Sequence, residues 1–493
     1  MKKIIIIGAG MGGLSLAGLL AKKGFQVHVF EKNPHPGGRC AKLVTDTAVF
    51  DAGATLLLMP EVFSELFSML SEDFTSSITL SRVNPTSRIY YDDNSFLDLT
   101  DDPSSMEKQL EKIEPGSYSR YVRFMKEAKN NFEISIPAFV RKSFPGFFSF
   151  FNLKNFRAII RVKGHRSYYA RVCSFFKSEK LRAAFSYPAV FIGLHPSDAP
   201  GFLSLLSYME IINGLWYPHN GMGHLSEKLY EICVKSGVNF SFNSPVEQIV
   251  TEKKRASGIR LGDGTFSPAD ITIANADTPY VYQSLLTPGK ESSILQKKKY
   301  AYSAITIYWT LNTRIHEFSR QHNIFLRSGY IGAFSAFFNS QTLPDEPHFY
   351  LNIPSRSHNR AAPEGKDTFM IVVPCGHINP EFNQDWKVLA QKARSAVIRR
   401  VTAAGVSNFE KLIIDERILT PKDWEEKLNL SRGSVFGSLG HELRQQGYLR
   451  GPNRHPDFKN LYFTGGCTHP GSGVPMVILG SMQTYRRICR ECL

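Results

Sequence analysis

The first 31 residues constrain the fold of this 493-residue chain most strongly. Ile4–Ile7 is a β-branched run typical of a buried parallel strand, and it leads directly into Gly-x-Gly-x-x-Gly, with glycines at positions 8, 10 and 13. This spacing predicts a tight turn at Gly8, close approach of the backbone to a pyrophosphate at Gly10, and close packing of the next helix at Gly13. We add Gly12 to the candidate contacts, and we expect the helix over residues 14–23 to point its N-terminus at phosphate groups.

A second strand and an acid complete the unit. Gln26–Phe30 is the expected strand, and Glu31 stands 21 residues after Gly10. A carboxylate at that place accepts hydrogen bonds from an adenosine ribose, and the adjacent Lys32 is a further candidate contact. Because strand, glycines, helix, strand and acid follow in this order, we favour a dinucleotide-binding unit over a Gly-rich turn in an unrelated α/β fold.

The same N-terminus could be mistaken for a targeting segment. Residues 4–21 follow a basic start and carry no charge, as a signal peptide or membrane span does. Five of these eighteen residues are glycine, however, and the nucleotide motif explains their spacing. We therefore expect a cytoplasmic protein without a transmembrane anchor.

The residues that follow Glu31 distinguish FAD from NAD. Pro36-Gly37-Gly38-Arg39 would bring the backbone close to the cofactor and place a guanidinium near its phosphates, and Phe50 to Thr55 reads Phe-Asp-Ala-Gly-Ala-Thr. With these segments the sequence resembles the glutathione-reductase-like flavoproteins, which include the amine oxidases, and within them the bacterial-type phytoene desaturases. The resemblance implies FAD, with Gly38, Arg39, Gly53, Ala54 and Thr55 among its contacts.

Four later segments extend the resemblance to the carotenoid-desaturase family. They are residues 214–223, residues 246–277, residues 421–453, and residues 460–476, which read NLYFTGGCTHPGSGVPM. The family implies that the backbone at Val246 contacts the adenine and that the N-terminus of a last helix faces the flavin ring, where its dipole favours negative charge. The candidate contacts there are Gly466, Val474, Pro475 and Met476.

The length of the chain predicts more than one domain. We expect an α/β fold in which residues 1–75, 218–285 and 440–493 form a discontinuous, Rossmann-like FAD domain of the glutathione-reductase type. Residues 76–217 and 286–439 would form a mixed α+β substrate domain. The resemblance is weakest over residues 71–180 and 290–410, where we expect substrate specificity to reside.

Positive charge is concentrated in one stretch. The net charge is +15, and residues 141–182 hold eleven Lys or Arg residues against the single acid Glu179. Seven phenylalanines are interleaved nearby, at positions 139, 144, 147, 148, 150, 151 and 156. We favour a peripheral membrane patch within residues 134–182, centred on Phe144–Phe151, over a buried aromatic core and over nucleic-acid binding.

The resemblance also implies the chemistry. The substrate would be a lipophilic polyene such as phytoene or its C30 analogue, which loses hydride to the flavin and a proton to a group that the sequence does not identify. His469 lies beside the flavin turn, but a lone histidine there is more often structural, and we assign no catalytic residue.

A second dinucleotide motif is lacking, so we expect oxygen or a quinone to accept the electrons. We expect no metal site, and the seven scattered cysteines favour a reducing compartment, with Cys489-x-x-Cys492 in a solvated tail.

Three other kinds of function remain open. Ketolases or oxidases, isomerases and saturases of the carotenoid-desaturase family share the flavin motifs, so the motifs do not separate them from desaturases. An amine oxidase would share the N-terminal unit, although the segment around His469 and the basic, hydrophobic middle fit it less well. A prenyl-binding escort would share the fold without flavin chemistry, but the intact glycines, Glu31 and Arg39 argue against it.

Overall fold

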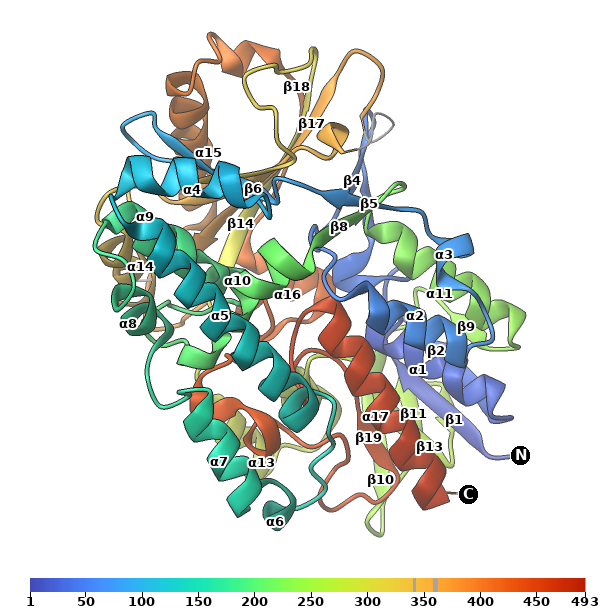
Figure 1. Ribbon diagram of the computed structural model, residues 1–493. Coiled ribbons are helices and arrows are strands. Elements are labelled where there is room, and N and C mark those ends of the chain that lie inside the picture. The colour runs from blue at the N-terminus through green and yellow to red at the C-terminus, as the bar shows by residue number, and fades with distance from the viewer. Residues whose placement is uncertain (340–342, 358–361, 493) are drawn as a thin grey trace.

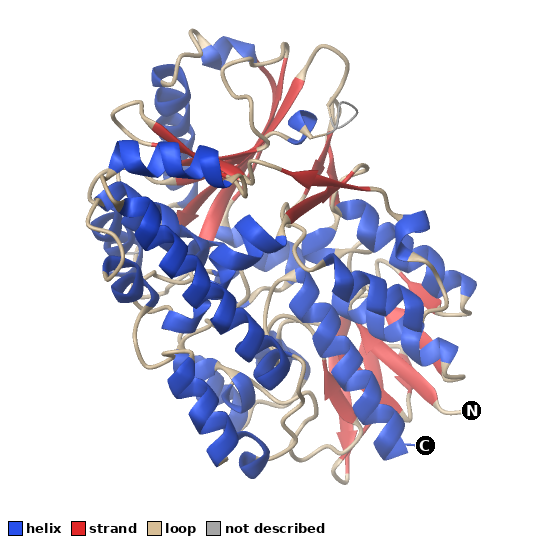
Figure 2. Cartoon of the chain, viewed as in Figure 1, coloured by secondary structure: helices blue, strands red, loops and turns tan. Residues whose placement is uncertain are grey.

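A five-stranded parallel sheet carries the nucleotide motif in the computed structural model, which describes residues 1–339, 343–357 and 362–492. Its strand order is β19-β13-β1-β2-β9, with every neighbouring pair parallel. The strands come from three distant parts of the chain: β1 (Lys3–Ile7), β2 (Gln26–Phe30), β9 (Asn239–Ser241), β13 (Ile271–Ala274) and β19 (Leu461–Phe463). The chain thus returns to this sheet twice, as Figures 1 and 2 show.

The two faces of this sheet are covered differently. Ile4 and Ile6 pack with α1 (Met11–Lys22), which contacts both α11 (Gly223–Lys235) and α17 (Val474–Cys492). Ile5 and Ile7 point to the other face, where the antiparallel strands β10 (Val246–Glu252), β11 (Arg255–Leu261) and β12 (Phe266–Pro268) lie. Alternate side chains of one strand therefore enter two cores, which explains why β1 is a continuous apolar run.

A seven-stranded mixed sheet forms the second part of the molecule, at the top of Figure 1. Its order is β18-β14-β17-β16-β15-β6-β7, and only β15 and β6 run parallel. The strands are β6 (Ser87–Tyr90), β7 (Phe96–Leu99), β14 (Ser303–Leu311), β15 (His322–Phe325), β16 (Phe349–Asn352), β17 (Asp367–Cys375) and β18 (Ile413–Leu419). The largest core joins them to helices α4 (Pro103–Ile113), α5 (Ser117–Ser135), α9 (Glu179–Ser186), α14 (Tyr330–Asn339) and α15 (Trp386–Ala403).

A layer of helices lies below this sheet, beside the nucleotide domain (Figure 1). Its lowest members are α6 (Phe147–Phe150) and α7 (Leu153–Arg161). In the centre, α10 (Leu205–Tyr208) continues into the π-helix Met209–Asn213 and then into β8 (Leu215–Pro218), which pairs with β5 (Leu80–Val83). Helix α16 (Pro421–Leu428) lies against β14 and β18.

The predicted fold class is confirmed: a Rossmann-like α/β unit is joined to a mixed α+β unit. The domain limits drawn from the sequence stay a prediction. Helix α1 begins at Met11, three residues before the expected start, because Gly12 and Gly13 already have helical geometry. The expectation of a solvated tail around Cys489 and Cys492 was wrong, since both lie in α17, half-buried, with Cys492 Sγ 3.8 Å from the Tyr462 hydroxyl.

The helices within residues 1–339, 343–357 and 362–492 include none that combines the length and apolar character needed to cross a membrane. The stretch that could be mistaken for a span is divided between strand β1 and helix α1.

Candidate functional site

The glycine turn between β1 and α1 forms one end of the site. Gly8 has φ +98°, in the left-handed region, and its N–H donates to the carbonyl of Phe30 at 2.7 Å. A Cβ on Gly13 would lie 2.1 Å from the carbonyl oxygen of Gly8, so the helix can approach the strand only with glycine there. Gly8, Gly10 and Gly12 line a large cavity, whereas Gly13 serves the packing behind it.

Helix α1 starts at this turn without a cap. Gly10 is the N-cap and offers no side-chain acceptor, and the first turn contains no acid. Uncapped N–H groups and the positive end of the helix dipole therefore open onto the cavity, which suits an anionic group such as a pyrophosphate.

Glu31 ties the end of β2 to this turn. Its buried carboxylate accepts the N–H of Ala9 at 2.8 Å and the backbone and side-chain N–H groups of Asn33, both at 2.9 Å. Lys32 lines the cavity, but its ammonium donates to the carbonyl of Glu426 at 2.7 Å and to the Asn429 side chain at 2.8 Å. Lys32 thus holds the end of α16 beside the cavity.

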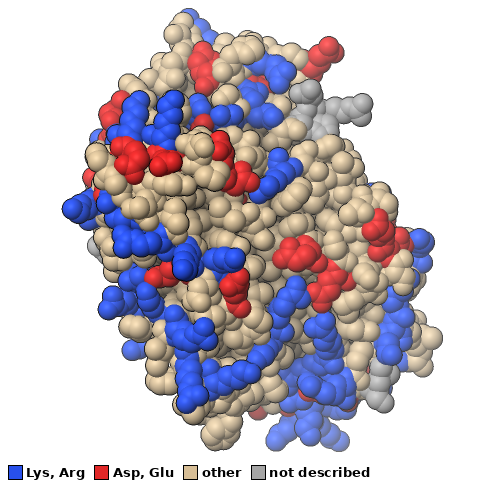
Figure 3. All heavy atoms as spheres, viewed as in Figure 1, with Lys and Arg blue, Asp and Glu red and all other residues tan. Residues whose placement is uncertain are grey.

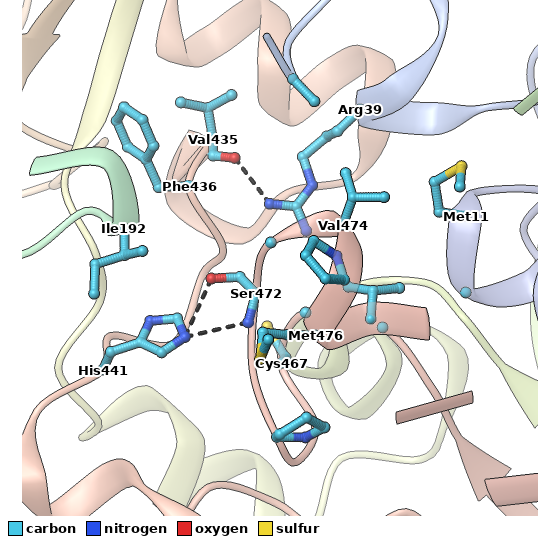
Figure 4. Close-up of a pocket in the computed structure, with 18 of the residues that line it drawn as sticks. Met11, Arg39, Ile192, Val435, Phe436, His441, Cys467, Ser472, Val474 and Met476 are labelled. Carbon is cyan, nitrogen blue, oxygen red and sulfur yellow. Dashed lines mark hydrogen bonds between the residues drawn. The ribbon is translucent and has the colours of Figure 1, made fainter. Parts of the chain in front are cut away.

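Arg39 crosses the middle of the site (Figure 4). Its guanidinium donates to the carbonyl of Val435 at 2.9 Å, and a Cβ on Gly466 would lie 2.8 Å from its other terminal nitrogen. Behind it, a Cβ on Gly53 would come within 2.7 Å of the Arg39 carbonyl oxygen. The structure therefore brings Gly38, Arg39, Gly53, Ala54, Thr55 and Gly466 together around one part of the cavity.

Residues 50–55 and residues 214–223, two separate segments of the family resemblance, meet at Asp51. Its carboxylate accepts the Tyr217 hydroxyl at 2.7 Å and the Gly223 N–H at 3.0 Å. The buried carboxyl thereby joins the strand before Thr55 to the start of α11. Burial raises its pKa, and these two hydrogen bonds partly oppose the rise.

The C-terminal turn closes the site from the other side. Val474 begins α17, and Val474, Pro475 and Met476 all line the cavity, as does Val246 from the first strand of the small sheet. Ser472 donates its backbone N–H to Nε2 of His441 at 3.2 Å (Figure 4). This bond assigns the proton of the neutral ring to Nδ1, which is buried and has no partner among the described residues. Burial and the charges of Arg450 and Arg39 hold the pKa of His441 well below its usual value, so the ring stays neutral.

His469 has a structural role. Its Nε2 donates to the backbone carbonyls of Lys142 at 2.7 Å and Phe139 at 3.1 Å, so it fastens the C-terminal turn to the segment that leads into α6. Burial lowers its pKa to about 4.

One cavity of about 810 Å³ joins these parts. Beyond the nucleotide turn it becomes an apolar channel between α10, α7 and the large sheet, and its lining extends from Phe151, Phe156 and Leu449 to Tyr350 and Met370. Its lining thus includes residues of α7, which Figure 1 places at the bottom of the molecule, and of β14 and β17 in the large sheet above. The sequence did not identify Tyr350, His441 or Glu210 as lining residues. Tyr350 and Glu210 stand in no motif, and nothing distinguishes His441 within residues 421–453.

The lower end of the channel coincides with an exposed apolar patch, here called the mouth patch. Phe148 is 84% exposed, Phe147 52% and Phe156 59%. Within the predicted centre, however, Phe144 is half-buried against His469, and Phe150 is buried. The patch is therefore displaced toward α7 from the expected position. Its members are Phe147, Phe148, Phe151, Leu153, Phe156, Ile160, Leu443, Tyr448 and Leu449.

No group of three or more His, Cys, Asp or Glu residues suited to hold a metal ion occurs in the described part of the chain.

Comparison with known proteins places the chain in a family. The family model described as flavin containing amine oxidoreductase matches residues 11–488. The chain belongs to this flavin-containing amine oxidoreductase family. Its cofactor is FAD, which suits the uncapped helix, the glycine turn and the size of the cavity.

Individual relatives cover the whole length. The chain is 36% identical to a zeta-carotene-forming phytoene desaturase of Myxococcus xanthus, over 99% of this chain and 94% of the relative. It is 35% identical to a phytoene desaturase of Fusarium fujikuroi, over 99% and 90%. An oxidoreductase structure from Methanosarcina mazei superposes with a TM-score of 0.64 at 17% identity, covering 98% of this chain and 100% of the other, which supports the fold alone.

Proposed function

We propose that this flavoprotein desaturates a carotenoid precursor, a phytoene-like or diapophytoene-like polyene, which loses hydride to FAD. The observation that carries the proposal is the single cavity, in which a nucleotide turn continues into an apolar channel that opens at the mouth patch. A small, charged amine would need polar partners along such a channel, whereas a long hydrocarbon needs none. Full-length relatives named as phytoene desaturases support the same substrate class.

We place FAD along the cavity by the chemistry of its walls. The N-terminus of α1 would hold the pyrophosphate, and Glu31 lies where the ribose would extend. The residues proposed to contact FAD are Gly8, Gly10, Gly12, Glu31, Lys32, Gly38, Arg39, Gly53, Ala54, Thr55, Val246, Gly466, Val474, Pro475 and Met476. Gly13 would act indirectly, by allowing α1 to pack close to the turn.

FAD supplies the hydride acceptor when bound, and the side chains of this protein orient the polyene and keep water away. Apolar residues such as Leu206, Phe191 and Val372 line the channel, so the polyene binds by burial of its surface. The Nδ1–H of His441 offers one hydrogen-bond donor beside the C-terminal turn. An external acceptor such as oxygen or a quinone would receive the electrons.

We further propose that the mouth patch rests on a membrane, from which the polyene enters. Helix α7 exposes Leu153, Phe156 and Ile160 along one stripe, with Lys154, Arg157 and Arg161 exposed beside it. This pattern is typical of a helix that lies in the interface of an anionic bilayer. Lys and Arg side chains gather over the lower part of the face shown in Figure 3, where Asp and Glu are sparse.

Incubation of the purified holoprotein with liposomes that contain phytoene or its C30 analogue, with a quinone added, tests the function. The proposal predicts a product with a longer conjugated system, detected by its absorbance at longer wavelength. Turnover of putrescine without any change in either polyene would replace the proposal by the amine oxidase alternative. A folded protein that neither contains nor takes up FAD would favour the escort.

A further inference from the structure

The channel contains one carboxyl group whose lone pairs are largely unused. Glu210 lies on the π-helix Met209–Asn213, is 5% exposed and lines the cavity. Its carboxylate accepts a long hydrogen bond from the Ser87 hydroxyl, at 3.4 Å. The polar groups that affect its pKa are the hydroxyls of Ser87 and Thr86, and neither is a cation. A buried carboxyl without a charged partner is costly, and such groups concentrate at functional sites.

Desaturation requires a group of this kind. Two C–H bonds of the substrate break: one leaves as hydride, and the electron pair of the other forms the new C=C bond. The second hydrogen therefore departs as a proton and needs an acceptor at the channel wall. We propose that Glu210 is this acceptor and that one of its carboxylate oxygens forms the O–H bond. The inference rests on the proposed desaturase function.

The other candidate bases along the cavity are already engaged. Glu31 accepts three N–H groups, and Asp277 accepts the Ser431 N–H together with a hydroxyl and a thiol. The Nε2 lone pair of His441 is occupied by the Ser472 N–H. His469 is a weak base, because burial lowers its pKa to about 4.

Tyr350 lines the same cavity as Glu210 and leads toward the part of the cavity around Arg39. The charge of Glu210 contributes to raising the pKa of Tyr350, which places the two side chains within electrostatic reach. The Tyr350 hydroxyl donates to Thr55 at 2.9 Å, and Thr55 stands two residues after Gly53, whose backbone lies against Arg39. Glu210 therefore lies in the same stretch of channel as the residues proposed to surround the flavin.

The surroundings of Glu210 suit proton transfer near neutral pH. Burial raises its pKa to about 7, close to the value at which a general base works best. The neighbours that interact with it, Tyr168, Tyr187 and Tyr350, all have raised pKa values and stay neutral in the working range. His322, bonded to Tyr350 at 2.6 Å, is also neutral because burial lowers its pKa to about 3. Glu210 is thus the group in this cluster that titrates near neutral pH.

Single-turnover flavin reduction by the polyene, measured in the Glu210→Gln holoprotein across pH 5.5–8.5, tests the assignment. We expect a rate roughly 10²- to 10⁴-fold below wild type, with FAD and polyene binding unchanged. The wild-type rate should fall as pH drops below about 7, and the variant should lose this dependence. Glu210→Asp, which keeps a carboxylate, should recover part of the rate. Glu425→Gln, which alters a raised-pKa carboxyl outside the cavity, is the matched control.

Infrared difference spectroscopy between low and high pH provides a readout that is independent of turnover. The C=O stretch of a protonated carboxylic acid should titrate near pH 7 in wild type and vanish in Glu210→Gln. A Glu210→Gln protein that retains the wild-type rate and pH profile would overturn the inference and leave the desaturase function intact. A wild-type protein that no polyene reduces would overturn both.

Discussion

The mouth patch makes the sharpest prediction about how the protein meets its substrate. Phe147→Asp combined with Phe148→Asp removes the two aromatic side chains at the start of α6, which are 52% and 84% exposed. Burial of a whole phenylalanine stabilises by about 1.5–3 kcal/mol, so these exposed fractions together correspond to about 2–4 kcal/mol of membrane affinity. The double variant should therefore bind vesicles roughly 30-fold to 1,000-fold more weakly.

Flotation with anionic liposomes, followed by a titration of lipid against bound protein, measures this change. The flavin spectrum and the melting temperature should stay close to wild type, because substitutions at exposed positions away from the core have small effects. Val388→Asp is the matched control: Val388 is 62% exposed on α15, at the opposite end of the molecule in Figure 1. Unchanged flotation of the double variant, or an equal loss with Val388→Asp, would refute the assignment of the patch.

The basic stripe of α7 gives an independent electrostatic test. Arg157→Gln with Arg161→Gln should weaken binding to anionic vesicles by about 2 kcal/mol, since each basic residue near such a surface contributes about 1 kcal/mol. Binding to neutral vesicles should hardly change, and salt should reduce the difference. Equal losses on both kinds of vesicle would point to altered folding of α7.

Two substitutions test the interior. Gly13→Ala should destabilise the protein by about 1–3 kcal/mol and lower its FAD content, since the new Cβ would lie 2.1 Å from the Gly8 carbonyl oxygen; Gly332→Ala, with open space around it, should do neither. Glu210→Gln should raise the free energy of unfolding, because the pKa of Glu210 rises from 4.5 to about 7 on folding. Ionisation of Glu210 destabilises the folded wild-type protein, and this cost develops as pH rises from 4.5 through about 7. The gain from the substitution should therefore be small at pH 5 and reach about 3 kcal/mol at pH 8. Chemical denaturation at the two pH values checks the second prediction, and an equal gain at both would contradict it.

The nucleotide-binding end could be predicted because its structure depends on residues that are close together in the sequence. The β-branched run of β1, the glycine spacing and Glu31 belong to one continuous βαβ unit, and each residue has a conformational or hydrogen-bonding reason for its place. Strand β2 matches its predicted bounds for the same reason.

The channel could not be read in the same way, because its residues meet only through the tertiary fold. Glu210, Tyr350 and His441 come from three distant segments, and only His441 lies in a segment that resembles the carotenoid-desaturase family. The aromatic stretch shows the intermediate case. Its composition indicated a surface patch, but only packing determined that Phe150 turns inward while Phe148 stays exposed.

Anaerobic reduction of the bound flavin by phytoene in liposomes tests the central claim most directly. The account predicts that the oxidised flavin spectrum bleaches in one turnover, with one new conjugated double bond formed for each flavin reduced. A flavin that remains oxidised with phytoene and with its C30 analogue, but bleaches with an amine, would contradict it.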